Sequence, residues 1–528
     1  MNLPVLIVGA GPVGLTMANL LAARGVPVVL AERNAATSDE AKAISLDDES
    51  LRTLQAAGLA EAVLGIVVPG TGTRYYDRKG RPLFHARGPE PYRLGYTFKN
   101  QFAQPELERL LLQALKDRDG ADVRFATELV AVSDAADGAV AHLRAGDGVT
   151  DLPVSWVLGC DGGRSTIREL RRIGMTGTSH RDVWLVADTL GDEHDERYGM
   201  HLGRPERPTV IVPGRDGRCR YEFRLRPGEG DSGARPDFAT IERLVSPYRA
   251  ITPDQVERCT NYTFNAVVAD RWRDGRCFLL GDAAHMMPPF AGQGLNSGVR
   301  DAANLAWKLA EVWHGRAAES LLDTYEAERR PHAAAMVEFS ERLGRVVMTV
   351  DPMRGRLRDT AVRALLLTPW GRRYLCEMRF RPRAVHTAGL VVRTGQGDER
   401  LVGTQLPQPR VLVPPSLRPR LLDDVLGTGL ALLGVDVGAA AWDRAAAALP
   451  PVTRVEVRLG ERLPRPRGER QAVADADGRL EAALAGARGR FVLVKPDRYI
   501  AAVFPPDQAA RVGAALARHI TVSPERTP

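Results

Sequence analysis

The sequence of 528 residues contains few cysteines, and none of them are paired at a spacing typical of metal or redox sites. The five cysteines form no C-x-x-C motif, and no H-x-x-x-H pattern accompanies them. They are Cys160, Cys219, Cys259, Cys277 and Cys376. An odd number of scattered cysteines is typical of reduced thiols. We therefore expect a cytoplasmic protein without a bound metal ion.

The chain also lacks long runs of like charge. Its 72 basic and 65 acidic residues give a net charge of +7, and the basic residues are interspersed among acids. No aromatic-basic motif accompanies this small excess, so we expect no nucleic-acid partner. A diffuse positive charge is compatible with an anionic cofactor or with NAD(P)H.

A long apolar segment occurs near the start, where residues 5–23 carry no charge. The segment approaches the length of a membrane span, but it holds three glycines and a proline, and no basic stretch precedes it. We expect neither a signal peptide nor a membrane-spanning helix, because these glycines have a better explanation.

The glycines form a dinucleotide-binding pattern. A β-branched run at residues 4–8 leads into Gly9-Ala10-Gly11-Pro12-Val13-Gly14, an apolar helical stretch and a second strand that ends at Glu32. In such a turn Gly9 permits the sharp bend, Gly11 admits a pyrophosphate, and Gly14 allows close helix packing. Glu32 would accept hydrogen bonds from a ribose hydroxyl. This motif predicts a dinucleotide without distinguishing FAD from NAD.

Two further segments place polar residues after buried strands. Asp161-Gly162 follows the apolar residues 154–158, and Gly281-Asp282 follows residues 278–280. The carboxyl ends of such strands are where open α/β sheets bind ligands. The segment Gly292-Gln293-Gly294-Leu295-Asn296 then begins a helix, whose first backbone N–H groups are free to bind a flat polar ring.

Together the three motifs resemble those of the class A flavoprotein monooxygenases, the para-hydroxybenzoate hydroxylase-like family. The 3-(3-hydroxyphenyl)propionate hydroxylase branch, which shares its pattern with antibiotic-tailoring oxygenases, is particularly similar. The resemblance covers residues 3 to about 340 and resumes in the tail. It implies an α/β fold with a Rossmann-like FAD-binding domain of the glutathione-reductase type, an inserted antiparallel-sheet substrate domain and a C-terminal thioredoxin-like domain.

The resemblance also implies the residues that bind FAD. Asp282 would hold the ribityl chain, the turn at residues 292–296 would line the flavin pyrimidine, and Asp161 and Arg168 would serve both FAD and NAD(P)H. Lys42 stands where the family often has arginine, so it keeps the charge but loses the bidentate fork. The full expected set is Gly9, Gly11, Pro12, Val13, Gly14, Glu32, Arg33, Lys42, Gln104, Asp161, Arg168, Asp282, Pro289, Gly292, Gly294, Leu295 and Asn296.

We expect the FAD-binding domain to be discontinuous. Its first part covers residues 1–180, with 76–99 directed toward the substrate domain, and its second part, with a helical segment, covers 271–388. The substrate-binding sheet would occupy 181–270, where alternating residues on either side of a turn at 214–217 predict a hairpin. The pattern at 317–350 predicts a helix broken at Pro331.

Residues 389–528 would form the C-terminal domain. Lys495-Pro-Asp-Arg-Tyr499 resembles the R-P-D-G-Y signature of the branch, with Arg498 in place of glycine, so we expect an altered turn. The absence of C-x-x-C argues against a redox role, and dimerisation or packing is the expected function. The oligomeric state, monomer or homodimer, stays open.

If the resemblance holds, NADPH or NADH reduces the flavin, and O2 gives a flavin C4a-hydroperoxide that hydroxylates a phenolic or polyketide-type aromatic substrate. The protein must exclude water and help to deprotonate the phenol. The candidate substrate-side residues are Asp47, Asp48, His201, Tyr221, Arg224 and Pro289. Two alternatives remain: Baeyer-Villiger-type oxygen insertion on a polyketide ketone, and a non-catalytic FAD-binding partner protein.

Overall fold

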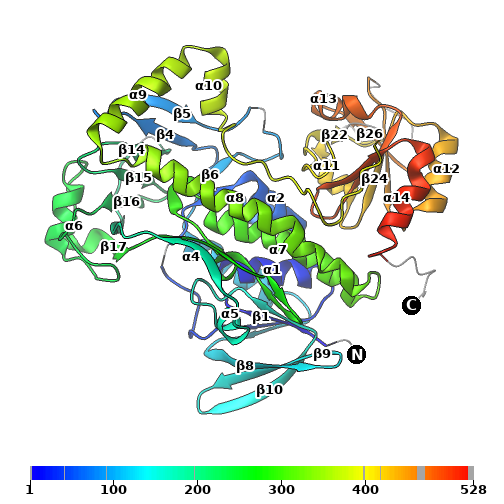
Figure 1. The fold of residues 1–528 in the computed structure, drawn as a ribbon, viewed down its shortest axis with the longest axis horizontal. Helices are drawn as coiled ribbons and strands as arrows, with labels where there is room; N and C mark the ends of the chain where they lie inside the picture. The colour runs from blue at the N-terminus through cyan, green and yellow to red at the C-terminus, as the bar shows by residue number, and fades with distance from the viewer. Residues whose placement is uncertain are drawn as a thin grey trace.

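The computed structural model describes residues 3–40, 42–90, 92–194, 197–395, 399–416, 418–460 and 470–520. Figure 1 shows an N-terminal α/β region at the centre, with a large antiparallel sheet on one side and a separate C-terminal region on the other. The first two are interleaved in sequence, since strands of the large sheet come from residues 73–86 as well as 184–262.

The α/β region is built on a six-stranded sheet with strand order β19-β20-β11-β1-β2-β7. All neighbouring pairs are parallel except β19 with β20. The strands are β1 (Val5–Val8), β2 (Val28–Ala31), β7 (Ala121–Arg124), β11 (Trp156–Gly159), β19 (Arg273–Asp274) and β20 (Cys277–Leu279). Strands β1 and β2 are buried at every position, as expected for parallel strands covered on both faces.

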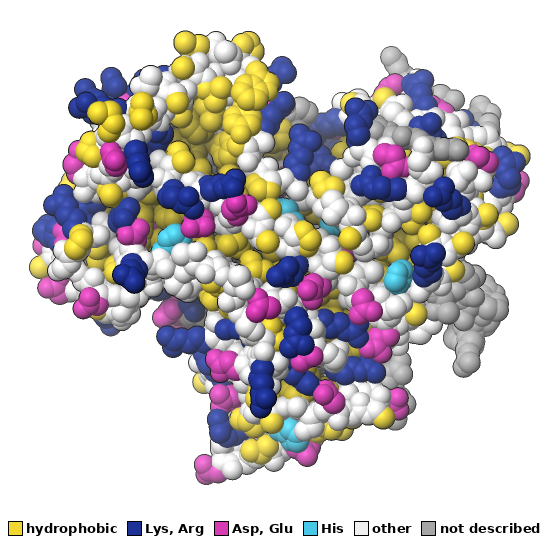
Figure 2. Space-filling view, viewed as in Figure 1, with side chains coloured by type: hydrophobic (Ala, Val, Ile, Leu, Met, Phe, Trp, Pro, Cys, Tyr) yellow, Lys and Arg dark blue, Asp and Glu magenta, His cyan; other side chains and the backbone are white. Residues whose placement is uncertain are grey.

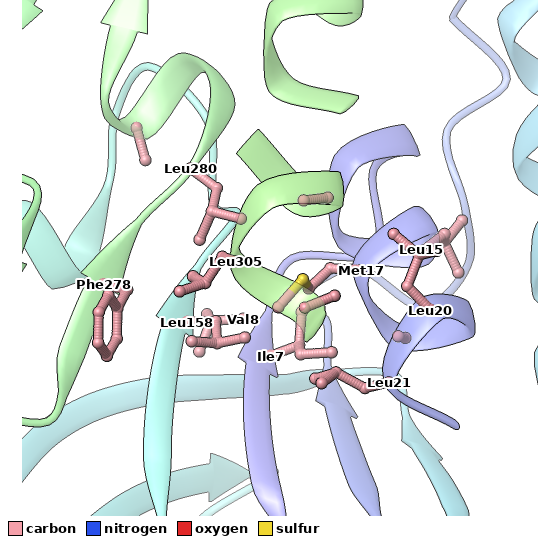
Figure 3. Packing of buried hydrophobic residues seen from close by; sticks show 14 of the residues in the cluster. Ile7, Val8, Leu15, Met17, Leu20, Leu21, Leu158, Phe278, Leu280 and Leu305 are labelled. Atoms are coloured by element: carbon pink, nitrogen blue, oxygen red, sulfur yellow. The ribbon is translucent and has the colours of Figure 1, made fainter. Parts of the chain in front are cut away.

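Helices α1 (Pro12–Ala22), α4 (Gln104–Lys116) and α7 (Gly294–Trp313) pack together on this sheet. Their apolar side chains interlock with those of the strands (Figure 3). The residues labelled in that view are Ile7, Val8, Leu15, Met17, Leu20, Leu21, Leu158, Phe278, Leu280 and Leu305. This packing fixes the carboxyl ends of β1, β11 and β20 side by side, which brings the three sequence motifs to one edge of the sheet.

Smaller elements surround the sheet. A three-stranded antiparallel sheet joins β8 (Thr127–Ala135), β9 (Gly138–Ala145) and β10 (Gly148–Val154). A second one joins β12 (Met175–Ser179), β18 (Asn265–Ala269) and β21 (His285–Met286). The pair β3 (Ser45–Asp47) and β6 (Lys99–Gln101) leads into α2 (Asp48–Ala56), while α3 (Ala60–Leu64) and α5 (Thr166–Leu170) are short.

The large sheet has seven strands in the order β17-β13-β16-β15-β14-β4-β5, and all neighbouring pairs are antiparallel except β14 with β4, which is parallel. They are β4 (Thr73–Tyr76), β5 (Pro82–Ala86), β13 (Trp184–Thr189), β14 (Gly199–Leu202), β15 (Thr209–Pro213), β16 (Cys219–Arg224) and β17 (Val256–Tyr262). The expected hairpin is confirmed, since β15 pairs antiparallel with β16. One face packs on α6 (Phe238–Val245), and the other faces the α/β region.

The expected break at Pro331 is wrong. Helix α8 (Thr324–Val347) runs through this proline without interruption. A proline inside a helix costs about 3 kcal/mol. However, four side chains close to this proline are buried: Glu328, Arg329, His332 and Ala333. Tertiary packing on both sides of the proline therefore outweighs the local preference.

The C-terminal region contains a seven-stranded sheet in the order β23-β22-β26-β25-β24-β27-β28. Its strands are β22 (Arg410–Leu412), β23 (Arg420–Leu421), β24 (Ala431–Val435), β25 (Thr453–Val457), β26 (Gln471–Asp475), β27 (Arg490–Val494) and β28 (Ile500–Phe504). Its helices are α11 (Leu422–Leu426), α12 (Ala439–Ala448), α13 (Arg479–Leu484) and α14 (Ala509–Leu516). Before this region, α9 (Pro352–Leu366) and α10 (Pro369–Cys376) form a helical pair above the large sheet (Figure 1).

On the face shown in Figure 2, lysine and arginine side chains alternate with acidic ones, and apolar side chains gather over α9 and α10. The exposed apolar residues of this pair include Met353, Leu357, Leu367 and Trp370. Among the described residues, no helix is both long and apolar enough to cross a membrane.

Candidate functional site

The glycine turn after β1 has the conformation that the sequence predicts. Gly9 has a φ of +105°, and a Cβ there would lie 2.5 Å from the carbonyl oxygen of Cys160. A Cβ at Gly14 would overlap the carbonyl oxygen of Gly9. By contrast, a Cβ at Gly11 would meet no atom within 4 Å. Gly9 and Gly14 are thus required by internal packing, whereas Gly11 borders open space at the edge where a pyrophosphate would approach.

The start of α1 offers unused donors. The first backbone bond of the helix joins Leu15 N to Gly11 O, and in the described part of the chain the N–H groups of Val13 and Gly14 have no partner. Glu32 lies beside them, since its Oε2 accepts from Ala10 N at 2.9 Å. Free N–H groups at a helix N-terminus favour phosphate, so this arrangement fits a dinucleotide.

Arg168 joins the two aspartate-containing loops. Its guanidinium donates to Gly163 O at 2.7 Å and to Ala283 O at 3.2 Å. Asp161 caps the following helix, accepting from Ile167 N at 3.1 Å, while its Oδ1 is buried without a partner among the described residues. Burial raises the pKa of this carboxyl. The structure therefore gives both residues architectural roles, and it leaves Asp161 Oδ1 available to a ligand.

Asp282 directly follows Gly281 at the carboxyl end of β20. Its side chain is exposed to solvent, yet desolvation by the surrounding protein raises its pKa, opposed by the nearby charges of His285 and Lys42. Lys42 is also exposed and lies 3.8 Å from Glu40, and Arg33 is exposed as well. An exposed carboxylate and an exposed cation that lie close enough to interact suit a ligand that carries hydroxyls and phosphates.

The side-chain amide of Gln104 is bound to protein at both ends. Its Oε1 accepts from Ala43 N at 2.7 Å and its Nε2 donates to Glu108 at 2.7 Å. Both ends of the amide therefore have protein partners, so the side chain positions the segment that carries Lys42.

The second glycine turn is locked by Asn296. Its Nδ2 donates to Ser45 O at 3.0 Å and Gly292 O at 2.7 Å, while its Oδ1 accepts from Asp47 N and the Ser50 hydroxyl at 2.9 and 2.7 Å. Gly292 has a φ of +61°, and a Cβ at Gly294 would meet nothing within 4 Å.

At the start of α7, the N–H groups of residues 294–296 have no partner in the portion that the structure describes. The Asn296 side chain is thus structural, and the backbone of Gly294, Leu295 and Asn296 is the part that can contact a ring.

The face of the large sheet that looks toward these turns carries His201. This residue pairs in register with Tyr75 on β4 and Val210 on β15, and its ring lies 5.0 Å from that of Tyr75. Burial, with a smaller contribution from the Lys99 charge, lowers the pKa of His201 to about 3. The ring is therefore neutral at ordinary pH, and its Nδ1 is buried with no partner among the described residues.

Tyr221 is the one expected residue that lies on the wrong face. Because side chains alternate along a strand, Tyr221 on β16 points away from its neighbours Arg220 and Glu222. Its ring packs with Phe223 and Tyr248 in the core beneath α6. The structure therefore removes Tyr221 from the substrate-side candidates.

Arg224 pairs in register with Trp184, so both side chains lie on the same face of the large sheet. Arg224 ion-pairs with Asp182 at 2.5 Å, and its Nη1 donates to Met348 O at 3.4 Å. Pro289 begins a short 3-10 turn, and the next residue, Phe290, contacts Phe264 and Trp184 with ring centroids 5.3 and 5.4 Å apart. The turn after Asp282 therefore carries an aromatic cluster to the sheet.

Several charged residues on this sheet face escape the sequence analysis. Arg220 pairs with Asp188, Glu222 is buried beside them, and Lys99 donates to Thr73 Oγ1 at 2.6 Å. Burial lowers the pKa of Lys99 to about 8, opposed by the Glu222 charge. Charged residues that alternate with apolar ones along a strand usually indicate that the charged face is exposed to solvent. The sequence pattern of β16 therefore gave no indication that Arg220 and Glu222 are buried.

Asp48 lies at the start of α2 between two other acids. Desolvation, and next the charge of Asp47, raise the pKa of Asp48 to about 8 despite the opposing Arg381. Asp47 instead binds Arg300 and Arg381, which keep the pKa of its buried carboxyl low. With this pKa, the Asp48 carboxyl is protonated near neutral pH, and the neighbouring Asp47 donates its N–H to Asn296 of the turn at residues 292–296.

Comparisons with known proteins agree with this geometry. Residues 2–340 match the FAD binding domain family, and residues 403–519 match the HcaD C-terminal domain family. The 3-(3-hydroxy-phenyl)propionate/3-hydroxycinnamic acid hydroxylase of Mycolicibacterium gilvum is 37% identical, with 98% of this chain and 92% of that protein covered. The enzyme of the same description from Escherichia coli O8 is 34% identical, with 99% and 95% covered.

Solved structures lead to the same family. The complex of aklavinone-11 hydroxylase with FAD and aklavinone has a TM-score of 0.78 at 25% identity, covering 98% of this chain and 99% of that one. Anhydrotetracycline hydroxylase from Streptomyces rimosus has a TM-score of 0.76 at 26% identity, covering 99% and 100%. The chain belongs to the FAD-dependent aromatic hydroxylases, the flavoprotein monooxygenase family that includes the 3-(3-hydroxyphenyl)propionate hydroxylases.

Proposed function

We propose that the protein hydroxylates a small phenol of the hydroxyphenylpropionate class, using NADPH or NADH and O2. The observation that carries the proposal is the proximity of His201, on the face of the large sheet that looks toward the flavin-binding turns, and Lys99 of β6, whose Nζ donates to Thr73 of the same sheet. His201 has an unpartnered buried Nδ1, and no carboxylate lies within ion-pair distance of Lys99 among the described residues. The nearly full-length similarity to hydroxyphenylpropionate hydroxylases supports the substrate class.

When bound and reduced, FAD supplies the activation of O2. The chain's own residues act on the substrate. Neutral His201 can accept a hydrogen bond from the phenol O–H, and Lys99, charged below a pKa of about 8, can stabilise the phenolate. A phenolate is the more reactive nucleophile. Trp184, Phe264 and Phe290 can bind the ring and exclude water.

We propose that FAD contacts the unpartnered backbone N–H groups and the exposed charged side chains described above. The backbone at Gly11, Val13 and Gly14 would bind the pyrophosphate, and the backbone at residues 294–296 would bind the flavin ring. Asp282 and Lys42 would contact the ribityl and phosphate groups. Glu32 would bind the ribose, and Arg33, Asp161, Arg168 and Pro289 remain proposed contacts on the strength of the family motifs.

The test is NADPH and NADH oxidation by the FAD-loaded protein with 3-(3-hydroxyphenyl)propionate and a panel of phenols and polycyclic aromatics. We expect oxidation that rises with the phenolic acid, little H2O2, and a ring-hydroxylated product. The H201N variant should release more H2O2 per NAD(P)H consumed than the wild type. Y221F is the matched control, because Tyr221 lies on the opposite face.

The outcomes separate the alternatives. A lactone or ester product would support oxygen insertion, and stimulation only by polycyclic substrates would move the substrate class toward that of the solved relatives. Equal uncoupling by H201N and Y221F would contradict the proposed role of His201.

The C-terminal region supports a thioredoxin-like assignment. Strands β25, β24, β27 and β28 lie in this spatial order, with β24 parallel to β25, and with β27 antiparallel to both β24 and β28. This is the arrangement of a thioredoxin core, and α12 connects β24 to β25. We propose this fold for residues 389–528, and the division at 180, 270 and 388 for the rest. A cytoplasmic location and a monomer or homodimer remain predictions.

A further inference from the structure

A hydroxyl of the C-terminal region reaches the start of α2. Tyr499 Oη donates to Glu49 Oε1 at 2.8 Å, and Gln405 Nε2 donates to the same oxygen at 3.1 Å. These residues are nine-tenths or more buried, and they lie 450 and 356 positions from Glu49 in the sequence. The C-terminal region therefore contributes two donors to a carboxylate of the FAD-binding region.

Glu49 also binds Arg300 of α7. The other carboxylate oxygen of Glu49 accepts from Arg300 Nε, while Arg300 Nη2 binds Asp47. Arg300 Nη1 donates to Gln293 Oε1 at 3.1 Å, and Arg381 Nη2 donates to the same Gln293 oxygen at 2.6 Å. Gln293 is the residue directly before Gly294, so the chain of contacts ends in the turn that faces the flavin.

The turn is held from its other side by the same group of residues. Asp47 N donates to Asn296 Oδ1 at 2.9 Å, and Asn296 Nδ2 binds Gly292 O at 2.7 Å. Asp47 also forms an ion pair with Arg381, whose Nη2 lies 3.1 Å from Asp47 Oδ2. Movement of Arg300 would therefore disturb Gln293, which is part of the turn at residues 292–296, and Asp47, which binds Asn296 of the same turn.

The charges in this cluster depend on one another. Burial alone would raise the pKa of Glu49, but the Arg300 charge and the hydrogen bonds from Arg300 and Tyr499 lower it to about 2. Two carboxylates, Asp47 and Glu49, thus balance two guanidinium groups, Arg300 and Arg381, in a buried setting where electrostatic interactions are strong.

Tyr499 itself is rigidly placed. Its ring stacks on His386 with centroids 3.9 Å apart and an interplanar angle of 11°. Lys495 donates to His386 Nδ1 at 2.9 Å and ion-pairs with Glu328 of α8 at 2.9 Å. Asp497 accepts from Asn304 of α7 at 2.7 Å. The Lys495–Tyr499 segment is therefore docked on both long helices, and the Tyr499 hydroxyl has little freedom to move.

We propose that Tyr499 is a positioning residue for the flavin: through Glu49 and Arg300 it fixes the turn at residues 292–296, so that the C-terminal region sets the FAD affinity and the flavin redox potential. The inference rests on FAD binding and not on the substrate proposed above. A failure of hydroxyphenylpropionate turnover would leave it intact.

The test compares three conservative variants as purified holoenzyme. Y499F removes only the hydroxyl, Q405M removes the second donor, and S320A is the control. Ser320 Oγ also joins the C-terminal region to the α7–α8 connection, at 3.1 Å from His519 Nδ1, but it has no link to the turn. The readouts are the Kd of FAD from fluorescence titration, the midpoint potential of the bound flavin, and Tm.

For Y499F we expect FAD binding weakened on the order of tenfold, with a shifted flavin potential, since a charge-assisted buried hydrogen bond is lost. Q405M should change both readouts in the same direction. S320A should lower Tm at most, with FAD affinity and potential unchanged. In an E49Q background, Y499F should add little further effect on the FAD Kd, because the acceptor through which Tyr499 acts is already altered.

Two results would overturn the proposal. One is a Y499F variant whose Tm falls like that of S320A while its FAD Kd and flavin potential match the wild type, which would make the contact one of domain docking only. The other is a Y499F effect on FAD affinity that is undiminished in the E49Q background.

Discussion

Arg220 and Asp188 form a two-point ion pair across neighbouring strands of the large sheet. Arg220 Nε and Nη2 lie 2.7 and 2.9 Å from the two oxygens of Asp188, and Arg220 Nη1 donates to Lys42 O at 2.7 Å. The same guanidinium therefore joins the sheet to the segment that carries Lys42. The pair is almost fully buried, so removing one partner should cost more folding stability than it would for a surface pair.

Removing Arg220 leaves Asp188 as a buried carboxylate that has lost its main partner. We expect R220A to lower the free energy of unfolding by about 3–5 kcal/mol, measured by urea denaturation. The matched control is R342A, since Arg342 pairs with Glu338 at an exposed site, where about 0–1 kcal/mol is expected. Similar losses for both variants would contradict the structural role assigned to Arg220.

The two glycines of the first turn should respond differently to alanine. In G14A the new methyl group overlaps Gly9 O, so we expect the apoprotein to be destabilised by several kcal/mol, read from Tm and urea unfolding. In G11A the methyl group meets no protein atom, and the backbone φ of −74° suits alanine. We expect the stability of apo G11A to stay within about 0.5 kcal/mol of wild type while FAD affinity falls. Unchanged FAD affinity in G11A would argue against pyrophosphate at this position.

Asp48 should make stability depend on pH. Its pKa is about 8 in the folded protein, against an unfolded value near 4, so the folded state binds more protons between these values. The free energy of unfolding should therefore fall as pH rises from about 4 to 8, by up to about 1.4 kcal/mol per pH unit.

The D48N variant tests this dependence, because asparagine cannot ionise. We expect D48N to have a higher Tm than wild type at pH 7.5, and a difference that shrinks toward pH 4.5. Thermal melts across this range provide the measurement. A D48N curve parallel to that of the wild type would show that the pKa of Asp48 is not raised.

Arg498, which stands where the family signature has glycine, has a positive φ of +68°. Its side chain is bound, since Nε lies 3.3 Å from Asp423 and Nη2 binds Gly427 O. R498A and R498G both lose these contacts, but only alanine retains the strain of a positive φ. We expect R498G to be more stable than R498A by about 1 kcal/mol in urea denaturation. Equal stability would mean that the turn relaxes in the variants.

Much of the nucleotide site was predictable because it depends on local rules. The turn at Gly9–Gly14, the hairpin at 209–224 and the aspartate after β20 each follow from short patterns of glycine, alternation and burial. The break expected at Pro331 failed because a local helix preference competes with packing along the whole of α8. The amide contacts of Gln104 with Ala43 and of Asn296 with Gly292 could not be predicted, because they depend on how separate segments pack together.

The sequence alone determined the family, the glycine turns and the strand that carries Tyr221, because those depend on spacing along the chain. Tertiary structure alone decided which face of that strand packs on α6 and which looks toward the turn that carries Phe290. Both faces are buried, so the alternation of Arg220, Tyr221 and Glu222 cannot distinguish them. The Tyr499–Glu49–Arg300 contact was equally hidden, since it joins residues 450 positions apart through the packing of two domains. No local propensity specifies such a contact.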